Sequence, residues 1–291
     1  MARPTRSWMF VPGNVQRFLD KAAGSSADVV FLDLEDGVLP ESKSRARDMV
    51  VTALRRQWHG PLRFVRVNAV DTPWFEDDLA AIVVPGLDGV CLPKVEDAEV
   101  VRDVAARLAR WESRNGLAPG SVRVVAAIET ARGLLRAHDV AASDPRVLGL
   151  MFGAEDFALD LGLGTHREAE AAELLVARSS LVVAAAAARV QSIDGVFPDL
   201  DDPEGLLADV VRARRLGFSG KSTFNPRQVE VINRVFSPQP DEIEYAERVV
   251  AAFEAAQARG EASVAVGGQL VDLPIVRRAQ RTLELARGED G

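Results

Sequence analysis

Acidic side chains gather directly after three apolar runs of the sequence. These acids are Asp33, Glu35, Asp36, Glu129, Glu155 and Asp156. Carboxylates that share one site repel one another unless protons or a cation compensate them. An all-oxygen set without histidine or cysteine suits a hard ion, Mg²⁺ or Mn²⁺, better than zinc. For any single acid, capping of the following helix is the simpler role, and only two of them need to bind an ion.

Arg66 lies inside an apolar stretch, Phe64-Val65-Arg66-Val67-Asn68. A buried guanidinium needs an anion beside it. A substrate carboxylate or an enolate oxygen would supply one through two parallel hydrogen bonds. An ion pair with one of the acids would do so equally well, and the spacing leaves both roles open.

Two lysines adjoin predicted strands: Lys94, after Leu92-Pro93, ends one, and Lys221, after Gly220, opens another. A Schiff-base aldolase would need such an amine, desolvated and with a depressed pKa. Among so many carboxylates a lysine is expected to stay protonated and to form salt bridges. The residues therefore favour metal-dependent chemistry over a Schiff base.

Eight short apolar runs, separated by helical segments, position these side chains. The predicted strands are Ser7–Val11, Val29–Leu34, Leu62–Asn68, Gly89–Pro93, Val122–Ile128, Leu148–Phe152, Ser192–Phe197 and Lys221–Phe224. Near-continuous apolar content is typical of parallel strands covered on both faces, and eight units close a (β/α)8 TIM barrel. Catalytic groups of such barrels lie at the carboxyl ends of the strands, where the acids are found. An open doubly wound sheet is the alternative, but it usually has fewer units and a GxGxxG turn after the first strand, which this chain lacks.

The barrel is expected to occupy residues 1–235 as the catalytic domain, followed by a helical extension at 236–291. Beyond the last strand the predicted helices are Pro226–Val235, which closes the catalytic domain, and Asp241–Arg259 and Asp272–Arg287, which belong to the extension. Gly260, Gly267 and Gly268 flank a hinge-like stretch. We expect the last helix to pack on a neighbouring subunit, because its apolar residues must be buried somewhere.

Composition narrows the class of protein. The 291 residues include 35 Lys and Arg against 43 Asp and Glu, a net charge of −8 that argues against nucleic-acid and anionic-membrane partners. A single cysteine, Cys91, excludes an intrachain disulfide and fits a reducing cytoplasm. The longest apolar stretch, Leu181 to Ala188, is well short of the roughly 20 residues that span a bilayer.

Six short blocks, taken in order, resemble the citrate lyase beta-subunit-like proteins, a family that includes malyl-CoA and citramalyl-CoA lyases and related thioesterases. The blocks are Arg6-Ser7-Trp8-Met9-Phe10-Val11-Pro12-Gly13-Asn14, Asp33-Leu34-Glu35-Asp36, Val65-Arg66-Val67-Asn68, Leu92-Pro93-Lys94-Val95, Ile128-Glu129-Thr130 and Phe152-Gly153-Ala154-Glu155-Asp156. The resemblance extends from about Arg6 to the last helix.

The resemblance implies a barrel with Mg²⁺, or Mn²⁺, held by Glu129 and Asp156. It also implies that Arg66 holds the oxygen on which enolate charge develops. The implied reaction joins or separates an acetyl thioester of CoA and a 2-oxo acid. Family resemblance further implies that Asp272 reaches a neighbouring subunit's site, although an aspartate before Pro274 also suits the N-cap of the last helix.

The remaining site assignments place Asp36 among the catalytic residues and Glu35, Lys94 and Asn225 among those that bind substrate. Many relatives have Ile-His-Pro after Gly-Lys, whereas this chain has Phe224-Asn225-Pro226. Asparagine keeps a polar contact but lacks a titratable ring, which leaves the acyl carrier and the substrate open.

We therefore expect a Mg²⁺-dependent lyase or thioesterase that acts on a 3-hydroxyacyl-CoA such as malyl-, citramalyl- or citryl-CoA. The expected assembly is a homo-oligomer, a trimer or a hexamer. The alternatives are a class II aldolase of free 2-oxo acids, a phosphoenolpyruvate-type lyase on the same barrel, and a non-catalytic barrel subunit of a larger lyase complex.

Overall fold

The computed structural model describes residues 5–164 and 172–289. The chain divides into two compact units, a larger one that spans Thr5–Asn233 and a smaller one that follows from Arg234. Within the described ranges, no helix combines the length and the apolar character that a membrane crossing requires.

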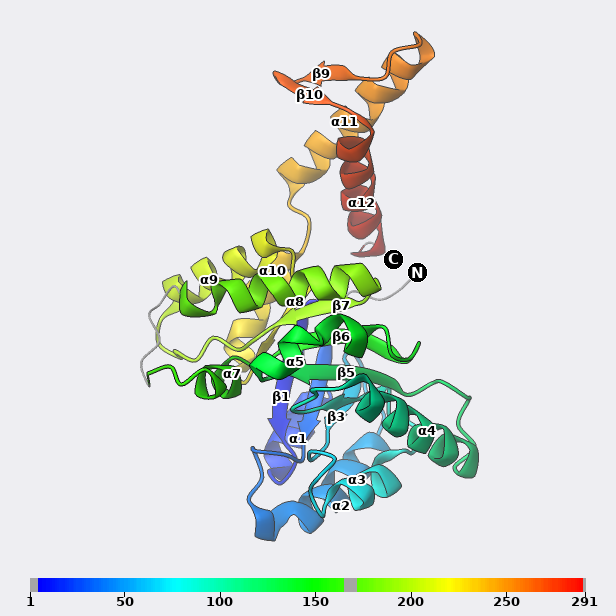
Figure 1. Ribbon diagram of the computed structural model, residues 1–291, viewed down its shortest axis with the longest axis vertical. Coiled ribbons are helices and arrows are strands. Elements are labelled where there is room, and N and C mark those ends of the chain that lie inside the picture. Colours follow the sequence, from blue (N-terminus) through cyan, green and yellow to red (C-terminus); the bar gives the residue numbers. More distant parts are fainter. Residues whose placement is uncertain (1–4, 165–171, 290–291) are drawn as a thin grey trace. The chain divides into compact units, whose positions relative to one another are not determined.

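The larger unit is a closed barrel in which each strand pairs in parallel with its neighbours in chain order (Figure 1). The strands are β1 (Ser7–Pro12), β2 (Val29–Asp33), β3 (Leu62–Arg66), β4 (Gly89–Leu92), β5 (Arg123–Ile128), β6 (Val147–Phe152), β7 (Gln191–Asp194) and β8 (Gly220–Thr223). Pairing of Ser7 with Lys221 joins the first strand to the last. The predicted TIM barrel is thus confirmed, with β7 ending earlier than expected: the chain leaves the sheet at Gly195, where a Cβ would lie 2.9 Å from the Phe152 carbonyl oxygen.

Helices surround this barrel (Figure 1). They are α1 (Gln16–Ala22), α2 (Lys43–Leu54), α3 (Phe75–Ile82), α4 (Ala98–Arg114), α5 (Ala131–Leu135), α6 (Ala137–Ala141), α7 (Ala154–Asp160), α8 (Leu175–Ala188), α9 (Pro203–Leu216) and α10 (Val229–Phe236), in which the larger unit ends. Short 3-10 turns occupy Pro40–Ser42, Ala172–Leu174 and Pro226–Gln228. Aspartate side chains cap the first turns of two of these helices. Asp97 accepts from the Glu99 amide at the start of α4, and Asp202 accepts from the Gly205 amide at the start of α9.

Alternate residues of the strands fill the barrel interior. The interior cluster comprises Trp8, Phe10, Val29, Phe31, Phe64, Cys91, Val125, Ala127, Met151 and Ile193. Successive side chains of a strand point to opposite faces, so residues two apart share the interior. The Trp8 and Phe31 rings stack with centroids 5.3 Å apart, and Gly89 makes room for Phe64, whose ring would lie 2.2 Å from an added Cβ. Cys91 is fully buried in this layer.

The smaller unit contains α11 (Pro240–Ala258), β9 (Val264–Val266), β10 (Gln269–Val271) and α12 (Leu273–Glu289). The two helices pack together around a core that includes Val249, Phe253 and Val276. The stretch flanked by Gly260, Gly267 and Gly268 was predicted to be hinge-like, but it contains β9, and Gly267 and Gly268 form the two-residue turn of an antiparallel hairpin with β10. Both have positive φ, 58° and 82°, which is the conformation that a tight hairpin turn demands and that glycine adopts without steric cost.

Candidate active site at the barrel mouth

Polar side chains continue the inward-facing series at the carboxyl ends of three strands. They lie two residues beyond Phe31, Phe64 and Ala127 of the interior cluster, and they are Asp33, Arg66 and Glu129. The same two-residue period that fills the barrel with apolar side chains therefore brings these groups into its mouth. All three are buried, with exposed fractions of 2%, 8% and 5%.

Arg66 is held by two acids and one aromatic ring. Its Nε and Nη2 donate to the two carboxylate oxygens of Asp33 at 2.7 Å each, and Nη1 lies 3.0 Å from Glu35 Oε2. The guanidinium carbon stands 4.7 Å from the centre of the Phe10 ring. Burial alone would lower the pKa of Arg66, but the Asp33 and Glu35 carboxylates raise it above its ordinary value. Three of its five N–H bonds meet these acids, and two are left for an oxygen of a ligand.

Both carboxylate oxygens of Asp33 help to shape the turn that follows β2. Besides the guanidinium, its oxygens accept from the amides of Glu35 at 3.0 Å and Gly37 at 3.1 Å. A Cβ on Gly37 would lie 2.3 Å from Asp33 Oδ2, so only glycine allows this close turn. The buried Lys43 ammonium donates to the carbonyls of Leu34 and Glu35. Asp33 therefore acts as an orienting group rather than as a free ligand.

Glu129 is a buried carboxylate with little compensation. Among the described residues its hydrogen-bond donor is the Lys94 amide, 2.9 Å from Oε2, and no Lys or Arg nitrogen lies within ion-pair distance. Gly153 provides the space for its side chain, since a Cβ there would lie 2.3 Å from Glu129 Cγ. Burial, followed by the nearby Glu35 and Asp156 carboxylates, raises the pKa of Glu129 to about 7.

These features fit a divalent cation. Glu129 and Asp156 line one hollow of about 360 Å³ together with Arg66, and a second one of about 570 Å³ together with Lys94. No three Asp, Glu, His or Cys side chains of residues 5–164 and 172–289 form a preformed cage. Mg²⁺ typically takes one or two carboxylates and completes its shell with water and substrate oxygens, so a two-carboxylate site suits it.

Lys94 brings its ammonium among the remaining acids. Nζ lies 3.4 Å from Glu35 Oε1 and 3.9 Å from both Asp36 Oδ2 and Asp156 Oδ1. Burial raises the pKa of Glu35, and the surrounding cations only partly oppose that shift. We use the name mouth cluster for Asp33, Glu35, Asp36, Arg66, Lys94, Glu129 and Asp156.

Two other predicted site residues have hydrogen bonds with residues outside the mouth cluster. Asn225 accepts from the Arg227 amide at 3.0 Å, and β8 and its end contribute Ser222 and Phe224, rather than Asn225, to the 360 Å³ hollow. Asp272 belongs to the smaller unit, where its Oδ1 accepts from the Ile275 amide at the start of α12. The N-cap role that the sequence allowed for Asp272 is therefore present.

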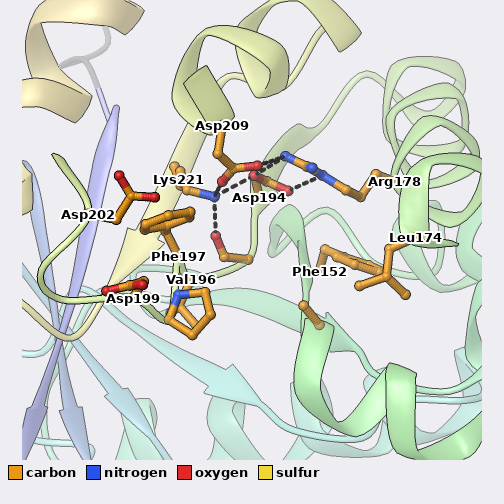
Figure 2. Close-up of a pocket in the computed structure, with 13 residues that line it drawn as sticks. Phe152, Leu174, Arg178, Asp194, Val196, Phe197, Asp199, Asp202, Asp209 and Lys221 are labelled. Carbon is orange, nitrogen blue, oxygen red and sulfur yellow. Dashed lines mark hydrogen bonds and ion pairs between the residues drawn. The ribbon is translucent and has the colours of Figure 1, made fainter. Parts of the chain in front are cut away.

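A second group of buried charges was not predicted from the sequence. Figure 2 shows Arg178, Asp194, Asp209 and Lys221, which we call the closed cluster, beside a pocket of about 190 Å³. Lys221 Nζ lies 2.7 Å from Asp194 Oδ2 and 2.6 Å from Asp209 Oδ2. Arg178 Nη2 bonds to the same two acids at 2.7 and 3.0 Å. With its amine enclosed by acceptors, Lys221 is unsuited to a Schiff base, in agreement with the expectation from the sequence.

The position of Asp194 is the signal in the sequence that leads to this cluster. Asp194 directly follows the inward-facing Ile193, so the period of a strand turns its side chain outward, toward the helices. Its partners come from three elements, Arg178 from α8, Asp209 from α9 and Lys221 from β8, and no local pattern predicts their contact with Asp194.

The fold and the site together define the class of this protein. It is a parallel barrel with acidic side chains and an arginine at its mouth. The chain belongs to the HpcH/HpaI aldolase/citrate lyase family, whose model matches residues 6–226. This confirms the resemblance seen in the sequence blocks.

Individual relatives carry more specific names. The chain is 39% identical over 285 residues to "Citrate lyase subunit beta" of Leuconostoc mesenteroides subsp. cremoris, covering 98% of this chain and 94% of that protein. It is 37% identical over 286 residues to "(3S)-malyl-CoA thioesterase" of Cereibacter sphaeroides, covering 98% and 95%. The crystal structure of protein CitE from Mycobacterium tuberculosis in complex with magnesium, acetoacetate and coenzyme A matches with a TM-score of 0.81 and 33% identity, over 98% of this chain and 99% of that one.

Proposed function

We propose that the protein is a Mg²⁺-dependent carbon–carbon lyase that cleaves or forms a 3-hydroxyacyl-CoA of the malyl, citramalyl or citryl type. The products of cleavage are an acyl-CoA and a 2-oxo acid. The observation that carries the proposal is the position of Glu129 and Asp156 at the same hollow as Arg66. The magnesium and coenzyme A bound by the Mycobacterium tuberculosis relative support the cofactor and the substrate class.

Glu129 and Asp156 are the proposed ligands of the ion. When bound, Mg²⁺, or Mn²⁺ in its place, supplies a Lewis acid that polarises the carbonyl of the 2-oxo acid. Arg66 directs its two remaining N–H bonds at the oxygen that gains negative charge, and Asp33 and Phe10 fix the plane of the guanidinium in advance. A preorganised donor stabilises such charge without reorganising during the reaction.

Proton transfer and substrate contacts involve the other polar residues. Cleavage requires a base for the substrate hydroxyl and an acid that returns a proton to the enolate carbon. We assign the first task to Asp36, which lines the 360 Å³ hollow, and the second to Asp272. Lys94, oriented by Glu35, offers its ammonium to a substrate carboxylate, and Asn225 contributes a neutral polar contact near the end of β8.

Asp272 requires an assembly of subunits in this proposal. Residues 236–291 would form the extension that covers a neighbour's barrel in a homotrimer or hexamer, and Leu270 and Leu273, 68% and 46% exposed, are apolar groups that such packing would bury. Asp272→Asn chains mixed with Glu129→Gln chains, each inactive alone, should regain part of the activity. No recovery despite proven subunit exchange would assign Asp272 to its own barrel or to no site. A cytoplasmic location, with no nucleic-acid or membrane partner, completes the proposal.

Metal binding tests the core of the proposal. Glu129→Ala and Asp156→Ala should each abolish Mg²⁺ binding in calorimetry as well as turnover, because either change removes half of the protein's carboxylate ligands. Glu155→Ala is the matched control, an exposed acid next to Asp156 that should retain affinity. Undiminished Mg²⁺ affinity in both ligand variants would reject the site.

Thioester hydrolysis is a second candidate reaction, favoured by the 37% identity to the Cereibacter sphaeroides thioesterase. Incubation of the protein and Mg²⁺ with a panel of 3-hydroxyacyl-CoAs separates the two reactions. Acyl-CoA together with 2-oxo acid indicates cleavage of the carbon–carbon bond, whereas free thiol without 2-oxo acid indicates hydrolysis.

A further inference from the structure

Lys94 has an unusual backbone conformation at the end of β4. Its φ is 52°, in the left-handed region that residues other than glycine seldom adopt. Such conformations persist where the surroundings over-determine them, and they cluster at functional sites. Here the backbone turns the Lys94 amide toward Glu129 while the side chain extends toward Asp156, so one residue contacts both proposed ligands of the metal.

The Lys94 ammonium also lies where the two hollows of the mouth meet. Glu129 and Asp156 belong to the linings of both hollows. Lys94 lines the 570 Å³ hollow. Its Nζ also lies 3.4 Å from Glu35 and 3.9 Å from Asp36, and Asp36 lines the 360 Å³ hollow. The ammonium therefore stands among the acids at the boundary, and its side chain, 41% exposed, has room to move away.

Charge within the mouth cluster explains this position. Five carboxylates face two cations, and the Asp33 carboxylate is already occupied by Arg66. Arg66 also pairs with Glu35, and the ammonium of Lys94 is the mouth-cluster cation that lies near Asp36 and Asp156 as well as Glu35. A lysine side chain ordinarily carries a positive charge at neutral pH, and the carboxylates around the Lys94 ammonium favour that charged form.

We infer that Lys94 is the internal counter-ion of the acidic mouth and that Mg²⁺ must displace its ammonium from Asp156 in order to bind. This inference rests on the proposed metal site. A divalent ion bound at Asp156 would be repelled by an ammonium that lies 3.9 Å from the Oδ1 atom of that carboxylate. The displaced ammonium is then free to meet the acid group of the substrate, which orders binding with the metal first and the acid second.

Calorimetric titration of the full-length protein with Mg²⁺, without substrate, tests the inference. Lys94→Met removes the competing charge and keeps an unbranched side chain at a strained position, so Mg²⁺ should bind about tenfold more tightly than in the wild type. Lys94→Arg keeps the charge and should stay within about threefold of the wild type. Arg132→Met is the matched control: Arg132 also lines the larger hollow but is 65% exposed and pairs with Glu96, so its loss should change affinity less than about threefold.

The outcomes separate this inference from the proposed function. Tighter binding in Lys94→Met alone supports displacement. Equal affinities in Lys94→Met, Arg132→Met and the wild type overturn it and leave the metal site intact. Failure of the wild type to bind Mg²⁺ overturns the proposed function itself, and circular dichroism of each variant verifies that the comparison is made between folded proteins.

Discussion

Two clusters of charged side chains occur in the barrel, one outside its strands and one at its mouth. The closed cluster faces outward from β7 and β8, and its two cations and two acids neutralise one another at distances of 2.6 to 3.0 Å. The mouth cluster lies at the carboxyl ends of the strands and holds more carboxylates than cations. Among the described residues, Glu129 accepts a hydrogen bond from one backbone amide, that of Lys94. Both clusters therefore contain buried charges, and imbalance of charge is what distinguishes the candidate active site.

Breaking the closed cluster should have the largest effect on stability. Asp194→Asn leaves Lys221 and Arg178 buried beside one acid instead of two, so the free energy of unfolding should fall by about 3–5 kcal/mol. Urea denaturation measures this loss, with Asp199→Asn, an exposed acid on the same pocket, as the control. Mg²⁺ affinity of the folded variant should stay within about threefold, since the two clusters are separate. A stability change as small as that of the control would mean that the cluster is dispensable.

Altering the mouth cluster at Arg66 should act on turnover rather than on folding. Arg66→Lys replaces a planar guanidinium with a point charge that cannot hold Asp33 and an oxygen of the substrate together. Loss of one such donor lowers kcat by about 10²–10³. Arg63→Lys is the control on the same strand, where the pair with Asp88 is 3.4 Å long and partly exposed. Kinetics near those of the wild type in Arg66→Lys would make Arg66 a structural ion-pair partner.

Ionisation of the Glu129 carboxyl group should destabilise the metal-free protein. Because the pKa of Glu129 is raised from 4.5 to about 7, its contribution to stability is complete below 4.5 and is lost as the pH rises through about 7. In EDTA, Glu129→Gln should therefore match the wild type near pH 4 and exceed its free energy of unfolding by about 1–3 kcal/mol near pH 8. A difference that does not grow with pH would show that the charge is compensated by groups other than a metal.

The exposed rim of the mouth cluster should matter least for stability. Asp36 is exposed and lies 3.9 Å from the Lys94 ammonium, so Asp36→Asn should change the free energy of unfolding by less than about 0.5 kcal/mol. Turnover of this variant should nevertheless decrease by about 10²-fold, the contribution expected of a proton-transferring group. Unchanged turnover would remove Asp36 from catalysis and leave it as a surface acid.

The barrel was predictable because each strand is marked by a sequence pattern within a few consecutive residues. Runs such as 29–32 are apolar on both faces, and residues that follow such runs must share the mouth once eight parallel strands close. The chemistry of the mouth followed from the same rule, since Asp33, Arg66 and Glu129 extend the period of the interior side chains. Of the two roles that the sequence left open for Arg66, the structure shows the ion pair with an acid, and contact with a substrate oxygen stays a prediction.

Features that depend on distant partners were not predictable. The closed cluster joins Arg178 of α8 to Asp194 of β7, a contact that arises only when the helix packs on the barrel. The positive φ of Lys94 depends on the acceptor that Glu129 provides 35 residues further along the chain. Gly267 and Gly268 fit a flexible hinge as well as a tight turn, and only the pairing of β9 with β10 decides between them.

The single cysteine of the chain offers a direct view of how often the barrel opens. Cys91 is fully buried among the interior side chains, and burial raises the pKa of its thiol well above the usual value. Thiol reagents attack the thiolate, so the closed barrel protects Cys91 both by exclusion and by protonation. The rate of labelling under native conditions, compared with the rate in denaturant, then gives the free energy of the opening that exposes the strand. The wild-type chain thus carries its own reporter of local unfolding, with no engineered probe and no second thiol to confuse the signal.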